Sequence, residues 1–231
     1  MKITFSFAIT ALSAMLLGVV SAPANAGILY VTNSGNSTIE RFTPGGAASV
    51  FASTGLYSPY GLVFDAAGNL FAANYGNNTI ERFTPGGAAS VFASTGLSSP
   101  TGLAFDSSGD LFASNYGNNT ISRFTPGGTA SIFASTGLSS PTGLAFDSSG
   151  NLYTSNLGNN TIEMFTPGGP ASVFATGLNG PIGLAFTHDE AVIPAVVPEP
   201  STWMLFVLGI AAFLALPRLG RHTGGSAPIA A

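Results

Sequence analysis

Four asparagines are the residues whose spacing best suits them to act together. Asn33, Asn74, Asn115 and Asn156 are 41 residues apart, and each follows a short apolar segment. If these segments surround one axis, the four amides form a channel or ligand ring for a hard cation such as Ca²⁺, which takes ~6–8 oxygen ligands. Four neutral amides bind a divalent ion weakly, however, and asparagine commonly caps a turn through nearby backbone. Both interpretations stay open; we predict no metal site, and Ca²⁺ is the only cofactor considered.

The groups that catalysis requires are missing from the repetitive part of the chain. There is no cysteine, the only lysine is Lys2, and His188 and His222 lie beyond the repeats. A disulfide framework, a thiolate metal site and a cysteine nucleophile are therefore excluded. Turn aspartates recur by copying, without an unlike partner that would separate their pKa values for acid–base chemistry. We expect no catalytic residue and no enzymatic activity. These aspartates are Asp65, Asp106 and Asp147.

Other polar groups have structural interpretations. His188, next to Asp189 and Glu190, resembles an acid–base cluster, but its place after the repeats favours a polar hinge. Glutamates on the predicted third strands have arginine neighbours in most copies, and exposed pairs of this kind contribute only ~0–1 kcal/mol. We expect solvated charge pairs. These glutamates are Glu40, Glu81 and Glu163.

The elements that must position these side chains come from a 41-residue unit present in four copies. The copies that begin at Gly68 and Gly109 differ at five of 41 positions. In the third copy, turn signals at 106–109 and 116–119 separate short segments rich in β-formers. The strands expected there are 101–105, 110–115, 120–124 and 130–135. A repeat of this length, with apolar residues on both strand faces, predicts an all-β fold: a β-propeller of four four-stranded repeats over residues 27–187.

The phase of the repeat predicts how the propeller closes. The chain enters the first copy after its first strand, at residue 28, and ends the last copy with an extra strand at 182–186. Pairing of the two ends would complete the fourth blade and hide two sheet edges. An open arc, or a ring completed by a second chain, is the alternative.

The repeat resembles the NHL-type β-propeller repeat. The matching segments are GLAFD at 143–147 and GNLYTSN at 150–156. The resemblance implies the propeller fold but little chemistry, because the family includes protein-, RNA- and ligand-binding members and lactonase-like relatives. The aspartate that follows the second strand in that family is asparagine in all four copies here.

The N-terminus carries an export signal. Lys2 precedes an apolar run at 3–20 and the small-residue site Ala24-Asn25-Ala26. Residues 1–26 are therefore predicted to be a signal peptide that signal peptidase cleaves between Ala26 and Gly27. A net charge of −4 without a basic cluster argues against nucleic acid as a partner.

The C-terminal residues contain the pattern of a second targeting signal. Pro198-Glu199-Pro200 precedes an apolar stretch at 203–216, which is followed by Arg218 and Arg221. We predict a linker at 188–197, a sorting signal at 198–222 with a single hydrophobic transmembrane helix at about 202–217, and a tail at 223–231. The segment resembles the PEP-CTERM sorting signal of Gram-negative bacteria. This resemblance implies transient residence in the inner membrane, processing by an exosortase, and delivery to the cell surface or extracellular matrix.

Together these features predict an exported β-propeller that acts as a binding or structural module for polysaccharide or envelope components. Tyr75 and Tyr116, which recur beside Asn74 and Asn115, suit repeated weak contacts with a polymer, whose avidity can exceed single-site affinity by ~10²–10⁴. The alternative is a metal-dependent lactonase-like or lyase-like hydrolase on the same fold. Two carboxylates and a basic residue that converge at one end of the channel would favour that alternative.

Overall fold

The computed structural model describes residues 27–167 and 171–187, which form β-strands joined by turns. The predicted signal peptide, linker, sorting signal and tail lie outside these residues. Within the two described ranges, no helix is long and apolar enough to cross a membrane. The expected helix at about 202–217 falls outside them.

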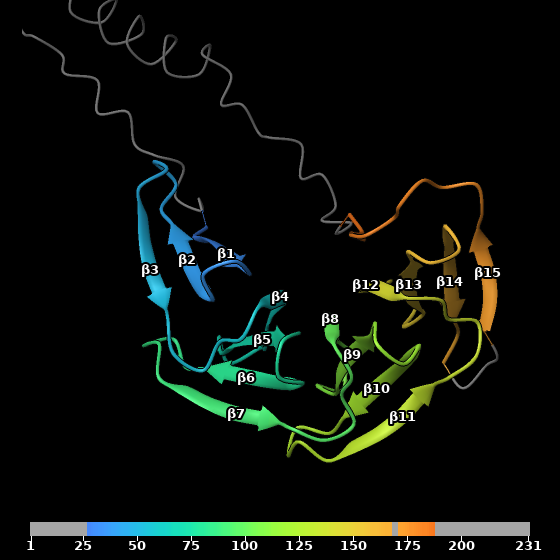
Figure 1. The fold of residues 1–231 in the computed structure, drawn as a ribbon, viewed down its shortest axis with the longest axis horizontal. Coiled ribbons are helices and arrows are strands. Elements are labelled where there is room, and N and C mark those ends of the chain that lie inside the picture. Colours follow the sequence, from blue (N-terminus) through green and yellow to red (C-terminus); the bar gives the residue numbers. More distant parts are fainter. Residues whose placement is uncertain (1–26, 168–170, 188–231) are drawn as a thin grey trace, which may run out of the picture. The chain divides into compact units, whose positions relative to one another are not determined.

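The strands form four antiparallel sheets, one from each copy of the repeat, in chain order (Figure 1). The first sheet contains β1 (Leu29–Asn33), β2 (Thr38–Phe42) and β3 (Ala48–Ala52). The second contains β4 (Pro59–Phe64), β5 (Leu70–Asn74), β6 (Thr79–Phe83) and β7 (Ala89–Ala93). The third contains β8 (Pro100–Phe105), β9 (Leu111–Asn115), β10 (Thr120–Phe124) and β11 (Ala130–Ala134). The fourth contains β12 (Pro141–Phe146), β13 (Leu152–Asn156), β14 (Thr161–Phe165) and β15 (Ala171–Ala175). The all-β, four-sheet prediction is confirmed.

Neighbouring sheets pack face to face through aromatic side chains that repeat with the sequence. Phe105 on β8 lies edge-on to Phe71 on β5, with 5.2 Å between ring centroids, and Phe146 on β12 meets Phe112 on β9 in the same way at 5.1 Å. The second strands β5, β9 and β13 are buried at every residue. Apolar residues on both faces of a strand are therefore used by both neighbouring sheets, as expected for propeller blades.

The first strands of successive sheets approach one another at glycines. A Cβ atom on Gly102 of β8 would lie 2.2 Å from the carbonyl oxygen of Thr142 on β12, and one on Gly61 of β4 would lie 2.3 Å from that of Thr101. The Ser114 hydroxyl donates to the Thr142 carbonyl at 2.6 Å and locks this approach. Only glycine fits at these positions, because any side chain would collide with backbone.

The predicted closure of the propeller by its two ends is wrong for this structure. The first sheet has three strands, β1 pairs only with β2, and residues 181–187 form no strand. Residues 181–187 keep the position relative to the fourth sheet that each first strand keeps relative to the sheet before it: a Cβ atom on Gly143 would lie 2.4 Å from the Ile182 carbonyl oxygen. Residues 182–184 thus follow β12 as β12 follows β8, and four sheets with this spacing leave them unpaired with β1.

Candidate functional site

The predicted asparagine ring lies inside the sheets. Asn74, Asn115 and Asn156 are completely buried. The Asn74 Oδ1 accepts a hydrogen bond from the Tyr57 backbone N–H at 3.0 Å, while its Nδ2 donates to the Gly55 carbonyl at 2.8 Å. Asn115 and Asn156 make the equivalent bonds to their own preceding loops. These amides therefore fasten the loop that leads from one sheet to the next.

This arrangement goes beyond the turn-capping interpretation. The bonded loop backbone lies 17–19 residues before Asn74, Asn115 and Asn156, so these amides do more than cap their own turns. Asn33 is partly buried and donates to Thr38. The Oδ1 atoms of Asn74, Asn115 and Asn156 are buried, and each already accepts a backbone N–H group. Within residues 27–167 and 171–187, no three acidic or histidine side chains gather in a way that could hold a metal ion.

A cleft of about 440 Å³ lies instead along the first strands of the sheets. The tyrosine after each buried asparagine in the second and third copies, Tyr75 and Tyr116, lines it together with Tyr60 of β4. Leu157 occupies the equivalent position in the fourth copy, and Ser34 occupies it in the first. The other lining residues are Gly61, Thr101, Gly102, Thr142, Gly143 and Ile182. We call this the tyrosine cleft.

The three tyrosines form a continuous aromatic surface in this cleft. The ring centroids of Tyr60 and Tyr75 are 5.1 Å apart, and the ring planes meet at 40°. The centroids of Tyr75 and Tyr116 are 6.2 Å apart, with an angle of 55°. Tyr60 is half exposed and the other two tyrosines are partly exposed, so a ligand in the cleft can reach all three side chains.

The floor of the tyrosine cleft is a network of hydroxyl and carbonyl groups. The Thr101 hydroxyl lies 3.0 Å from that of Ser114, which also accepts the Gly102 N–H at 2.8 Å. Thr142 and Ser155 repeat this pair one sheet later, at 2.9 Å. Because these groups bond to one another, the floor is rigid and its hydroxyl positions are preset.

The tyrosine cleft has no charged wall. Among the lining residues, tyrosine is the only titratable type, and no Asp, Glu, Lys, Arg or His contributes to the surface. Such a site can stack rings or apolar sugar faces and exchange neutral hydrogen bonds. It contains no pair of unlike titratable groups for acid–base chemistry.

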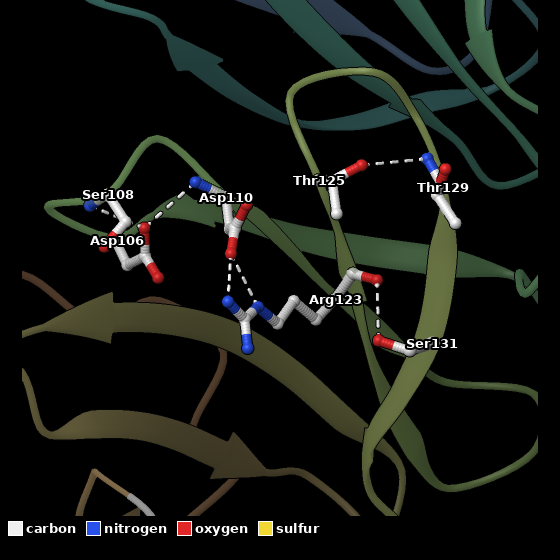
Figure 2. Close-up of polar contacts among 7 residues, drawn as sticks. All are labelled: Asp106, Ser108, Asp110, Arg123, Thr125, Thr129 and Ser131. Carbon is white, nitrogen blue, oxygen red and sulfur yellow. Dashed lines mark hydrogen bonds and ion pairs between the residues drawn. The ribbon is translucent and has the colours of Figure 1, made fainter.

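A second cleft, of about 510 Å³, is lined by charged side chains, of which Asp106 and Arg123 are drawn in Figure 2. Asp106, Arg123 and Asp147 line it, between the third and fourth sheets. The turn with Asp106 precedes β9 and Tyr116 follows β9, so the two clefts involve opposite ends of that strand. Arg123 forms an ion pair with Asp110, which is buried. The second and fourth copies have an asparagine at the position of Asp110.

The carboxylates in this second cleft are committed to their turns. Asp106 Oδ1 accepts the backbone N–H groups of Ser108 and Asp110, each at 2.9 Å. Asp147 bonds equivalently, and the hydrogen bond from the Asn151 amide holds the pKa of Asp147 below its usual value. The structural role expected for the turn aspartates agrees with this geometry.

The expectation of solvated glutamate–arginine pairs is wrong for two copies. Glu81 and Glu163 are each only 5% exposed, and burial raises the pKa of both carboxyl groups. Their side chains pack against Gly55 and Gly137. Neighbours on a strand point to opposite faces, so Arg82 cannot accompany Glu81 inward, and Glu163 is followed by Met164 instead of an arginine. In the described residues, the ion pair formed is Arg123 with Asp110.

Sequence reasoning found part of the tyrosine cleft. It named Tyr75 and Tyr116 from their recurrence beside the asparagines but missed Tyr60, Thr101 and Thr142. These three occupy the same position of successive repeats, directly before the glycine of each first strand. An alignment of the repeats at the residue before this glycine would have indicated all three.

The comparisons with known proteins agree with this architecture. The chain is 26% identical to a structure described as a nidogen/laminin complex, with a TM-score of 0.65. The match covers 71% of this chain and 66% of that one. Virginiamycin B lyase from Staphylococcus aureus is 22% identical, with a TM-score of 0.61 and coverage of 70% and 57%. A structure described as a putative gluconolactonase is 23% identical, with a TM-score of 0.60 and coverage of 72% and 66%. The chain thus spans less than two thirds of the length of these proteins, and the similarity establishes the propeller-type fold.

The C-terminal region gives the most specific match. Residues 196–218 match the PEP-CTERM protein-sorting motif. The chain carries an exosortase sorting signal. The motif contains Pro198-Glu199-Pro200 and identifies the protein as one that is exported and processed at the membrane. No curated protein matches the chain.

Proposed function

We propose that this PEP-CTERM protein is a non-catalytic binding module, delivered to the cell surface or extracellular matrix, whose tyrosine cleft holds a neutral polysaccharide. The observation that carries the proposal is the aromatic surface of Tyr60, Tyr75 and Tyr116 along one cleft. Tyrosine offers a broad apolar face and a polar hydroxyl at low conformational cost. A sugar chain presents the complementary pattern of C–H faces and hydroxyl groups.

The chemistry of the cleft supports a neutral ligand. An acidic polymer would meet a protein of net charge −4 and a cleft without Lys or Arg. The hydroxyl groups of the three tyrosines support hydroxyl-rich partners, because buried polar groups of a ligand need bonding partners. The absence of charged groups from the lining supports binding without turnover.

The test compares retention on neutral polysaccharides, including those of the producing cell's own matrix, for wild type and Tyr75→Ala. We expect affinity to fall about tenfold or more, since a central aromatic anchor typically contributes ~2 kcal/mol or more. Tyr57→Ala is the matched control, because Tyr57 is 56% exposed and does not line the cleft. Equal retention by wild type and Tyr75→Ala would refute the site.

The non-catalytic part of the proposal has its own test. Wild type should hydrolyse neither lactones nor esters above background, with or without added Ca²⁺. Turnover that is lost in Asp106→Asn or Asp147→Asn would instead place a hydrolase at the second cleft and overturn this part.

A further inference from the structure

Residues 181–186 occupy the place of a first strand that has no sheet. The Ser155 hydroxyl donates to the Ile182 carbonyl at 2.7 Å, as Ser114 donates to Thr142 at 2.6 Å. Phe186 meets Tyr153 edge-on at 5.0 Å, as Phe146 meets Phe112 at 5.1 Å. This segment therefore lies against the fourth sheet as if a fifth sheet began there.

The outward side of this segment is open. Ile182 is 64% exposed and Phe186 is 43% exposed. In the described residues, no strand pairs with 181–186. The segment thus combines a docked inner face with unpaired backbone.

The first sheet has the complementary deficiency. It lacks the strand that β4, β8 and β12 supply to the other three sheets. Leu29 on β1 is 62% exposed, whereas its equivalents Leu70, Leu111 and Leu152 are at most 1% exposed. The missing first strand and the missing preceding sheet together leave this leucine in solvent.

The outer strands show the same mismatch between the ends. Phe92 on β7 packs on Phe124 of the next sheet at 6.2 Å, and Phe133 packs on Phe165 at 5.7 Å. Phe174 on β15 has no next sheet in the described chain and is 61% exposed. Phe42 of the first sheet occupies the position of Phe124 and Phe165 in its repeat.

We infer that two copies of this chain associate head to tail, with residues 181–186 of each copy pairing with β1 of the other as its missing first strand. The repeat fixes the register. Because Phe146, Ala145 and Leu144 pair with Leu152, Tyr153 and Thr154, the corresponding pairs between copies are Phe186 with Leu29, Ala185 with Tyr30, and Leu184 with Val31. Phe174 of one copy then packs on Phe42 of the other.

A second copy satisfies both ends at once. The contact is heterologous, because it joins the end of one copy to the start of the other. Two copies that make this contact at both ends form a closed ring in which neither end has a free sheet edge. It contains eight sheets, which lies within the ~4–8 blades found in propellers. Own-chain pairing would satisfy the same groups, but in this structure β1 and residues 181–186 remain apart.

Disulfide trapping can separate these two arrangements, because the chain has no cysteine of its own. Val31→Cys and Leu184→Cys are placed in separate chains, expressed together from full-length genes, and oxidised. We expect a disulfide-linked dimer of one chain of each kind, and no cross-link from either variant alone. Pairing Val31→Cys with Ala185→Cys is the control, because adjacent strand residues point to opposite faces.

Sedimentation of the cysteine-free protein provides an independent measure. We expect twice the mass of one processed chain, and a monomer for Leu184→Asp but not for Thr187→Asp. A monomeric wild type would overturn the inference. Trapping of Val31→Cys with Leu184→Cys only when both are in one chain would also overturn it, in favour of own-chain closure.

Discussion

The rings of Tyr75 and Tyr116 lie 6.2 Å apart although 41 residues separate them in the chain. Each follows a buried asparagine that is bonded to the loop before its sheet. The asparagines thus set where the tyrosines leave the sheets, and the sheet spacing sets the distance between the rings.

Leu157→Tyr should increase retention on a neutral polysaccharide. Leu157 lines the tyrosine cleft at the position of Tyr75 and Tyr116, so a third copy of the ring would lengthen the aromatic surface. We expect a several-fold gain, measured by titration calorimetry or affinity electrophoresis. Leu157→Met is the control for apolar size without a ring, and an equal gain from it would argue against stacking.

Gly102→Ala should destabilise the protein by about 1–3 kcal/mol or more, because overpacking has this cost even where neighbours can shift. The neighbour here is the Thr142 backbone carbonyl, 2.2 Å from the added atom. Urea unfolding measures the change. Gly127→Ala is the control, since its nearest contact would be an ordinary 3.9 Å to the Thr125 hydroxyl. Similar losses from both variants would contradict the close-approach argument.

Glu81→Ser should raise stability at neutral pH. Burial raises the pKa of Glu81, so the folded state holds the proton more tightly than the unfolded state. Stability is therefore greatest below the unfolded pKa and falls as the pH rises through the folded pKa. The third copy already has Ser122 at this position, bonded to Asn115. Between pH 4 and 8 (roughly the range in which a carboxyl group with a raised pKa titrates), the melting temperature of the variant should change less with pH than that of wild type. An equal change of melting temperature with pH in both proteins would contradict this prediction.

Asp110→Asn should change stability by less than ~1 kcal/mol, since a pair with one exposed partner contributes little. The variant loses the ion pair with Arg123, whose side chain is 48% exposed. It gains the bond that Asn69 makes to Asp65 in the second copy, at 2.8 Å. The melting temperature should also become less sensitive to salt. A large loss would show that the ion pair fixes the second cleft.

Replacement of Pro198, Glu199 and Pro200 by alanine should leave full-length protein in the inner membrane, because these residues form the start of the matched sorting motif. Fractionation and intact-mass measurement of the protein check this. Release of a normally shortened protein from the variant would contradict a sorting role for the triplet.

The repeat made most of the fold predictable, because turn residues and apolar alternation recur in four copies and reinforce one another. Strand positions such as Thr120–Phe124 agree with the structure. The failure of residues 182–186 to pair with β1 was not predictable, because the repeat does not state the angle between successive sheets, which decides whether four sheets bring the two ends together. The burial of Glu81 was missed for a related reason: the pattern of a strand does not say which polar side chain lies over a glycine in a neighbouring loop.

The joints between sheets are closely similar, since the glycine approach recurs at Gly61, Gly102 and Gly143 and the buried asparagine contacts recur in the second to fourth sheets. Gain or loss of one whole 41-residue unit by unequal recombination would leave every remaining joint intact. The number of repeats in the protein can therefore change without a change in the contacts that stabilise each sheet. Each added unit would bring one more side chain to the position of Tyr75, so the reach of the surface toward a polymer becomes a quantity that selection can lengthen or shorten in single steps.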